Sequence, residues 1–113
     1  MKQTYILPEE KIKELVPSMG YCIASDRITV DGCSVGFMYR ETRESDEDSG
    51  WRFLAGDETE EYLANKMNIM MFDVNYIANI DPAIIPFLKQ KTGSEYERIE
   101  NSNSFKPYTE NSI

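Results

Sequence analysis

The fold is indicated first by the stretch ITVDGCSVGFMYR, residues 28–40, which carries the strongest local pattern in the chain. The pair Asp31-Gly32 lies between two β-prone runs and can supply the positive φ angles that a type I′ hairpin turn requires. Beyond it Val35, Phe37 and Tyr39 occupy every second position, so we expect these bulky side chains on a buried face of a sheet. The pattern predicts two antiparallel strands joined by a tight turn.

Strands and helices are also predicted on both sides of this stretch. Further strands are expected at apolar or alternating runs, namely residues 21–25, 51–55, 69–72 and 95–100. An amphipathic helix is expected to end around Pro17, and three more are expected after the capping residues Asp57, Asp73 and Asp81. Glu60, three residues after Asp57, completes a capping-box pattern.

These elements define the expected fold class. We expect a small single α+β domain over residues 1–100, with an antiparallel sheet and short helices packed on it. Residues 101–113 are rich in Asn and Ser and are expected to form a polar C-terminal tail that frays. The methionines Met67, Met70 and Met71 are expected to fill the core.

The composition excludes several kinds of chemistry. The 113 residues include 12 Lys and Arg, 20 Asp and Glu and no His, for a net charge of -8. Without histidine, Ser-His-Asp and Cys-His catalysis and histidine zinc sites are excluded. Cys22 and Cys33 are too few for a zinc site made of cysteines alone, and we expect both to be buried on strands.

The charge and the apolar runs also bear on location and partners. A pI near 4.5 disfavours binding to nucleic acid and to anionic membranes. The first eight residues lack the pattern of a signal peptide, and no apolar run approaches the roughly 20 residues that span a bilayer. We therefore expect a cytoplasmic protein with reduced thiols and no cofactor.

The acidic residues are concentrated in one part of the chain. Between Glu41 and Glu61 there are 9 acidic residues and 2 arginines, a net charge of -7. The run Asp46-Glu47-Asp48 does not match a calcium-binding loop, and the acids after Gly56 are typical of a helix start. The simplest interpretation is a solvated acidic surface.

One motif carries a resemblance to a known family. The run DSGWRFLAGDE, residues 48–58, resembles the signature of a bacterial family that was first catalogued as of unknown function and later assigned to immunity proteins of polymorphic toxin systems. Residues 35–41, the Asn-rich residues 75–88 and the pair Glu97-Arg98 resemble flanking parts of that family. The similarity extends over residues 21–98.

This resemblance implies a non-enzymatic, protein-binding role. An acidic surface suits a basic toxin, because complementary charge speeds association and discriminates between partners. Trp51 or Tyr39 would supply an apolar anchor. The candidate partner-binding residues are Arg40, Glu41, Glu44, Asp46, Asp48, Trp51, Asp57 and Glu58, and no catalytic or metal-binding residue is expected.

A second hypothesis belongs to a different class of function. Asp57 and Glu58 would serve a small-ligand or divalent-metal-dependent enzyme, with Arg40 or Arg52 holding an anion. The sequence leaves the toxin's identity and the oligomeric state open.

Overall fold

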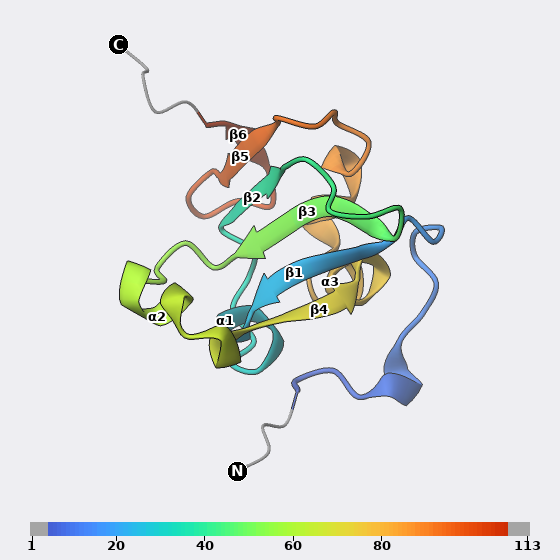
Figure 1. The fold of residues 1–113 in the computed structure, drawn as a ribbon, viewed down its shortest axis with the longest axis horizontal. Helices are drawn as coiled ribbons and strands as arrows, with labels where there is room; N and C mark the ends of the chain where they lie inside the picture. Colours follow the sequence, from blue (N-terminus) through green and yellow to red (C-terminus); the bar gives the residue numbers. More distant parts are fainter. Residues whose placement is uncertain (1–4, 109–113) are drawn as a thin grey trace.

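The protein is built on one six-stranded sheet. The computed structural model describes residues 5–108, and in it the strands follow the spatial order β4-β1-β3-β2-β5-β6 (Figure 1). β1 and β3 pair in parallel, whereas the other neighbouring strands pair antiparallel. The strands are β1 (Tyr21–Ser25), β2 (Phe37–Arg40), β3 (Asp48–Leu54), β4 (Ile69–Asp73), β5 (Glu95–Arg98) and β6 (Phe105–Pro107).

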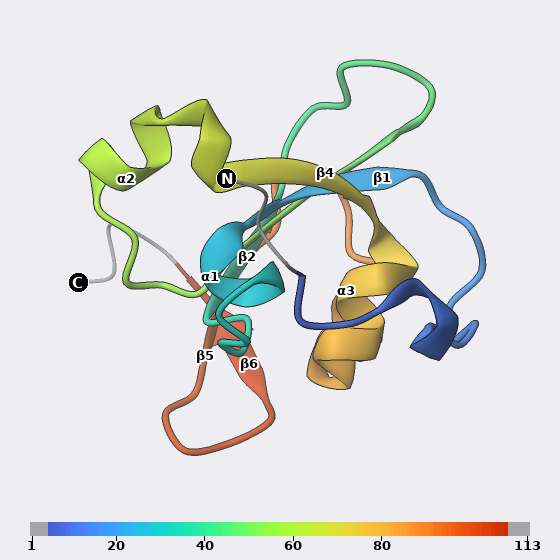
Figure 2. The same ribbon diagram turned by 90° about the horizontal axis from the view of Figure 1, so that it is seen from below.

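The helices are short and lie mainly on one side of this sheet. They are α1 (Asp26–Thr29), α2 (Glu60–Ala64) and α3 (Val74–Ile80), with 3-10 turns at Glu9–Lys11, Lys66–Asn68 and Pro82–Phe87. Figure 2 shows α1 and α3 below β1 and β4, α2 beyond the ends of the strands, and the segment between β2 and β3 rising above them. The sheet therefore has a covered face, against which α1 and α3 pack, and an open face on the opposite side.

The covered face carries the hydrophobic core. Cys22 of β1, Met38 of β2, and Trp51 and Phe53 of β3 are fully buried, and they pack with Ile77 of α3. Burial raises the pKa of the Cys22 thiol. These strand positions share one face because side chains alternate along each strand and the register aligns Met38 with Phe53. The expected α+β class, a sheet with short helices packed on it, is confirmed.

Several local predictions also hold. Asp73 caps α3 by accepting a hydrogen bond from the Asn75 amide, and Asp81 accepts one from the Ala83 amide at the next turn. That turn is a 3-10 helix containing Pro86, which lacks the N–H a regular helix needs. β5 follows a turn at Gly93, whose φ of 99° suits glycine.

The prediction of an amphipathic helix that ends around Pro17 is wrong. The segment forms only the 3-10 turn at Glu9–Lys11 and then runs extended beside α3. The Asn75 side chain accepts hydrogen bonds from the amides of Leu15 (2.8 Å) and Val16 (3.1 Å). Asn75 and Asn79 both donate to the Lys13 carbonyl. These side chains satisfy backbone groups that a helix would have paired internally.

The prediction of a hairpin around Asp31-Gly32 is also wrong. Residues 26–29 form α1, which Ser25 caps by accepting a hydrogen bond from the Arg27 amide. Gly32 does have a positive φ of 81°, but its amide donates to the Ile28 carbonyl and ends the helix. Cys33, expected on a buried strand, lies half-buried outside any strand.

The faces of β2 and the position of β4 differ from expectation as well. Met38 is fully buried, whereas Phe37 and Tyr39 are half-buried on the open face. β4 is an edge strand, and Met67, Met70 and Met71 are exposed rather than in the core, with Met67 75% and Met71 63% exposed. Residues on both faces of these strands are apolar, so alternation alone does not identify the buried face.

The C-terminal region includes a strand that the sequence pattern does not predict. Phe105 is buried, and β6 pairs with β5 at the edge of the sheet, although residues 101–108 were expected to fray. The Phe105 ring packs against Phe87, with 5.3 Å between the ring centroids, and the apolar area that it buries stabilises this segment. Residues 109–113 of the expected tail lie outside the described part of the chain.

Candidate protein-interaction surface

The open face combines apolar side chains with carboxylates. Phe37 and Tyr39 of β2, Leu54 of β3 and Ile23 of β1 are half-buried there, and Met71 of β4 is exposed at the edge. Their shared face follows from the register, which aligns Phe37 with Leu54 and Ile23 with Met71. In Figure 1 this face points toward the reader. It is the one broad sheet surface that α1 and α3 leave uncovered.

Two hollows indent this face, and both include Glu95. The larger, about 560 Å³, lies beside Phe37, Glu58 and Glu97, and we refer to it as the Glu58 hollow. The smaller, about 330 Å³, lies beside Tyr39 and Glu41, and we refer to it as the Glu41 hollow. The larger volume is within the usual range for ligand pockets, although both hollows are open to solvent.

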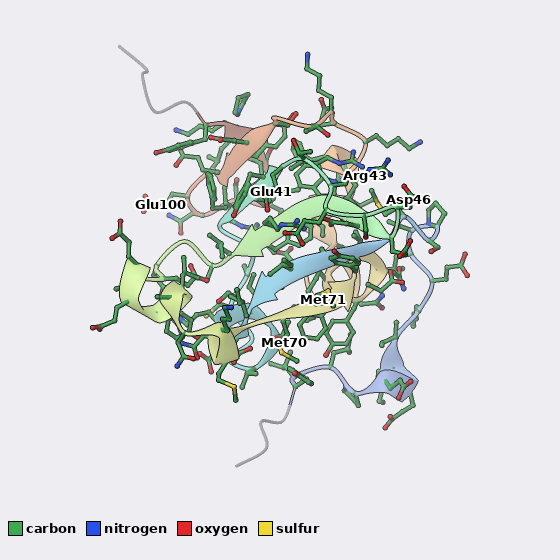
Figure 3. All side chains as sticks on the ribbon, in the orientation of Figure 1. Glu41, Arg43, Asp46, Met70, Met71 and Glu100 are labelled. Carbon is green, nitrogen blue, oxygen red and sulfur yellow. The ribbon has the colours of Figure 1, made fainter. Side chains whose placement is uncertain are left out.

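An acidic loop, residues 41–47, borders one end of the open face. All seven residues are exposed, and Glu41, Arg43 and Asp46 follow the loop from β2 to the start of β3 (Figure 3). Four of the seven are acidic and one is basic, a net charge of -3. Glu44 and Glu47 complete the acidic set.

Asp48, in contrast, is part of a buried ion pair. Its carboxylate is 1% exposed and accepts hydrogen bonds from Nη1 (3.0 Å) and Nη2 (2.9 Å) of Arg52, which is itself 3% exposed. The amides of Glu44 and Gly50 also donate to it. These bonds, first of all those from Arg52, hold the pKa of Asp48 well below its usual range. Asp48 therefore stabilises the start of β3 and is not available to a partner.

Arg52 also joins the acidic loop to the sheet. Its Nε donates to Glu41 at 2.6 Å, and the carboxylates of Asp48 and Glu41 raise the pKa of Arg52. The Glu41 side chain is half exposed, so one end of this network remains at the surface. The pair Arg52–Asp48 lies on the open face but is sealed from water by the loop that Glu41 and Glu44 anchor.

Trp51 and Arg40, both candidate partner-binding residues, contribute to the core. Trp51 is 0% exposed, stacks on Phe53 and donates from Nε1 to the Leu88 carbonyl at 3.1 Å. Arg40 lies over the Trp51 ring and donates to the carbonyls of Ser49 and Gln90. Burial lowers the pKa of Arg40. Trp51 is therefore not a surface anchor, and Tyr39, the other candidate, is the one that reaches the open face.

Asp57 and Glu58 lie at the opposite end of β3 from the acidic loop. The sequence predicted that Asp57 caps α2, and this prediction is wrong. Thr59 caps that helix by accepting a hydrogen bond from the Tyr62 amide. Instead Asp57 binds Arg27 through Nη2 (2.6 Å) and Nε (3.2 Å), and this pair lowers the pKa of Asp57. Glu58 accepts from the amides of Ala55 (2.7 Å) and Gly56 (2.9 Å).

The candidate residues therefore form two groups rather than one patch. Glu41, Glu44 and Asp46 lie at the start of β3, and Asp57 and Glu58 lie beyond its end. Seven residues of strand separate them by roughly 20 Å. Between them lie residues that the sequence analysis did not select, Phe37, Glu95 and Glu97. The alternation of Phe37 and Tyr39 was visible in the sequence, but it was assigned to the core.

The carboxylates named for the enzyme hypothesis are occupied by structural contacts. Arg27 binds Asp57, backbone amides bind Glu58, and Arg52 is buried against Asp48. Within residues 5–108, no three Cys, Asp or Glu side chains are grouped so that they would hold a metal ion. In the same part of the chain no helix has the length and apolar character needed to cross a bilayer.

The structure thus shows a small α+β domain in which α1 and α3 cover one face of the sheet and leave the other uncovered. Residues 22–109 match the model of the immunity protein Imm33 domain. This match covers most of the chain, and the chain belongs to the Imm33 immunity protein family. No curated protein and no solved structure matches it. The resemblance found in the sequence is confirmed at the level of the family, which implies a toxin as partner and a non-enzymatic role.

Proposed function

We propose that the protein neutralises a cognate bacterial toxin by direct contact through its acidic surface, without catalysis. Membership of an immunity protein family is the observation that carries this proposal. The toxin would be basic, and the contact would cover the open face and the acidic loop. The cytoplasmic location expected from the sequence is part of the same proposal.

The charge distribution supports a basic partner. Glu44, Asp46 and Glu47 are exposed on one loop, with Arg43 as the only positive charge among residues 41–47. Exposed charges of one sign accelerate the encounter with a partner of opposite charge, and salt weakens this effect. The acidic loop would therefore act mainly on the association rate.

The apolar part of the open face supports a stable contact. Tyr39 and Phe37 lie 5.7 Å apart between ring centroids and are only half-buried in the free protein. Burial and the nearby Glu41 carboxylate raise the pKa of Tyr39, so its hydroxyl stays protonated. Aromatic side chains of this kind commonly carry most of the energy of an interface once water is excluded.

Charge reversal on the acidic loop tests the proposal. The toxin is first sought in the adjacent gene, by asking whether co-expression of this protein suppresses its lethality. With the purified pair, the variant E44K/D46K/E47K is expected to slow association about tenfold at low salt and to flatten its salt dependence. The variant E9K/E10K/E14K changes the net charge equally at exposed positions of the N-terminal segment and serves as the control.

The control separates a local surface from a general charge effect. Equal slowing by both variants, or no slowing by either, would contradict the proposed surface. Because the proposal contains no metal, inhibition is expected to persist in EDTA. A requirement for Mg²⁺ or Mn²⁺ would instead favour the enzyme hypothesis.

A further inference from the structure

The Glu58 hollow has an aromatic wall. Phe37 of β2 and Tyr108 pack edge to face, with ring centroids 5.2 Å apart at 85°. The Tyr108 amide donates to the Glu95 carbonyl at 2.9 Å, which fixes the tyrosine beside β5. Both rings are half-buried and line the hollow. The π faces of such rings attract cations.

Three carboxylates line the same hollow from two sides. Glu95 and Glu97 lie on β5 at successive positions of one face, and Glu58 lies on the turn after β3. Two backbone amides hold Glu58 in place. Among residues 5–108, the Glu95 carboxylate has no hydrogen-bond or ion-pair partner, and Glu97 faces only Lys106 at 3.6 Å. An exposed pair of this kind contributes little, so Glu97 remains available.

The positive charge nearest the hollow is already neutralised. Arg98 lines it, but its guanidinium binds Asp81 and donates to the carbonyls of Val35 (2.8 Å) and Ser102 (2.9 Å). It also lies over the Phe105 ring on the covered side of the sheet. The hollow therefore combines a net negative charge, one fixed carboxylate, two available carboxylates and aromatic rings in a volume of about 560 Å³.

We propose that the Glu58 hollow binds an arginine side chain that the toxin projects onto the open face. A guanidinium is planar, stacks on aromatic rings and donates paired hydrogen bonds to carboxylates, so it matches the two rings of the hollow and the carboxylates of Glu95 and Glu97. The ammonium of lysine has the same charge, but it is not planar and does not present two parallel N–H donors to a carboxylate. This inference rests on the proposed function and adds to it the anchor that the partner supplies.

The site can be tested without the toxin by using N-acetyl-arginine amide as the probe. In NMR titrations this probe is expected to cause saturable shifts at the amides of Gly36, Phe37, Gly56 and Tyr108. The neutral analogue N-acetyl-citrulline amide is expected to cause none. The variant E95Q/E97Q is expected to weaken arginine binding about tenfold, because it removes two charges while keeping the shape of both side chains.

A matched control distinguishes the hollow from general acidity. The variant E60Q/E61Q removes two exposed charges from α2, which do not line the hollow, and is expected to bind arginine as the parent does. Shifts spread over the whole acidic surface, equal binding of citrulline, or unchanged binding by E95Q/E97Q would overturn the site. Binding of N-acetyl-lysine amide as tight as that of arginine would overturn the preference for a guanidinium.

A second measurement separates this inference from the proposed function. If the toxin binds but E95Q/E97Q leaves its affinity unchanged, the arginine anchor is overturned while the proposed function stands. If arginine binds in the hollow but the adjacent gene product is neither bound nor neutralised, the proposed function is overturned. The expected result is a loss of toxin affinity in E95Q/E97Q of about tenfold or more, with no loss in E60Q/E61Q.

Discussion

The two faces of the sheet are built from the same strands but have different properties. On the covered face Met38, Trp51 and Phe53 are fully buried, whereas on the open face Phe37 and Tyr39, the sequence neighbours of Met38, are half-buried. On the covered side Arg98 is paired with Asp81, whereas the open face is bordered by exposed carboxylates at both ends. The difference indicates that the hydrophobic core stabilises the fold from one face, whereas the other face keeps apolar side chains partly exposed.

The pair Asp48–Arg52 is an informative exception. It lies on the open face, yet the acidic loop seals it, so this part of the open face behaves like core. Asp46, two residues away, remains exposed. Neighbouring acids in one run thus have different roles, and each can be tested separately.

The largest expected effect is that of removing the buried carboxylate. Asp48→Ala is expected to lower the free energy of unfolding by about 3–5 kcal/mol, because it leaves the Arg52 guanidinium buried without its partner. The measurement is urea denaturation. Asp46→Ala, on the exposed part of the loop, is expected to change the free energy of unfolding by less than about 0.5 kcal/mol. Similar losses in both variants would contradict the distinction between the two acids.

A core substitution tests the covered face directly. Ile77→Ala is expected to cost about 2–5 kcal/mol, because it opens a cavity between α3 and the sheet. Met71→Ala, on the open face, is expected to cost less than about 0.5 kcal/mol. The same denaturation experiment measures both. A comparable loss for Met71→Ala would show that the open face also stabilises the fold.

Acid is expected to weaken the Asp48–Arg52 pair without a mutation. The pKa of Asp48 is lower in the folded than in the unfolded protein, so its contribution is complete at pH values above the unfolded value of about 3.9. It is lost as the pH falls below that value toward the folded pKa. The free energy of unfolding, measured from pH 7 to pH 2.5, should therefore fall mainly below pH 4. A midpoint near neutral pH would point to a different group.

Replacing a buried carboxylate that has no partner should change the free energy of unfolding in the opposite direction to replacing Asp48. Asp26 is 2% exposed, and among residues 5–108 neither of its side-chain oxygens has a hydrogen-bond partner. Asp26→Ala is expected to raise the free energy of unfolding by about 1 kcal/mol, because it removes a desolvated polar group. Thermal and urea denaturation measure the change. A clear loss of stability would mean that ordered water or another group satisfies this carboxylate.

The smallest effect on stability is expected from oxidation. Met67, Met70 and Met71 are exposed, so hydrogen peroxide should convert them to sulfoxides while Met38 on the covered face stays reduced. Peptide mass spectrometry after brief treatment gives the order of reaction. Oxidation of Met38 at the rate of Met71 would contradict the assignment of the two faces.

Some local features were predictable from short-range rules, although the hairpin at Asp31-Gly32 and the cap at Asp57 were not. The caps at Asp73 and Asp81 follow from aspartates before apolar runs, and β4 and β5 follow from short β-prone segments. The N-terminal segment was not predictable in this way, because Asn75 and Asn79, about 60 residues later, take over its backbone hydrogen bonds. The face of Phe37 was misassigned because Met38 is apolar too.

The candidate site was only partly visible in the sequence. The exposed acids Glu41, Glu44 and Asp46 were selected, but Glu95 and Glu97 were not, because β5 comes beside β2 only in the folded sheet. The residue type made Trp51 a candidate anchor, yet its position on β3 places it in the core, with its Nε1 donating to the Leu88 carbonyl. Residue type alone does not distinguish an anchor from a core residue.

The sequence by itself determined the acidic charge, the absence of histidine chemistry, the α+β class and the family, because composition and short-range patterns suffice for these. Tertiary structure alone decided which acids are exposed, which face of the sheet stays open and which aromatic rings line a hollow. Burial and ion pairing depend on strand order and register, and these bring together residues far apart in the chain. Asp48 and Asp46 differ for that reason.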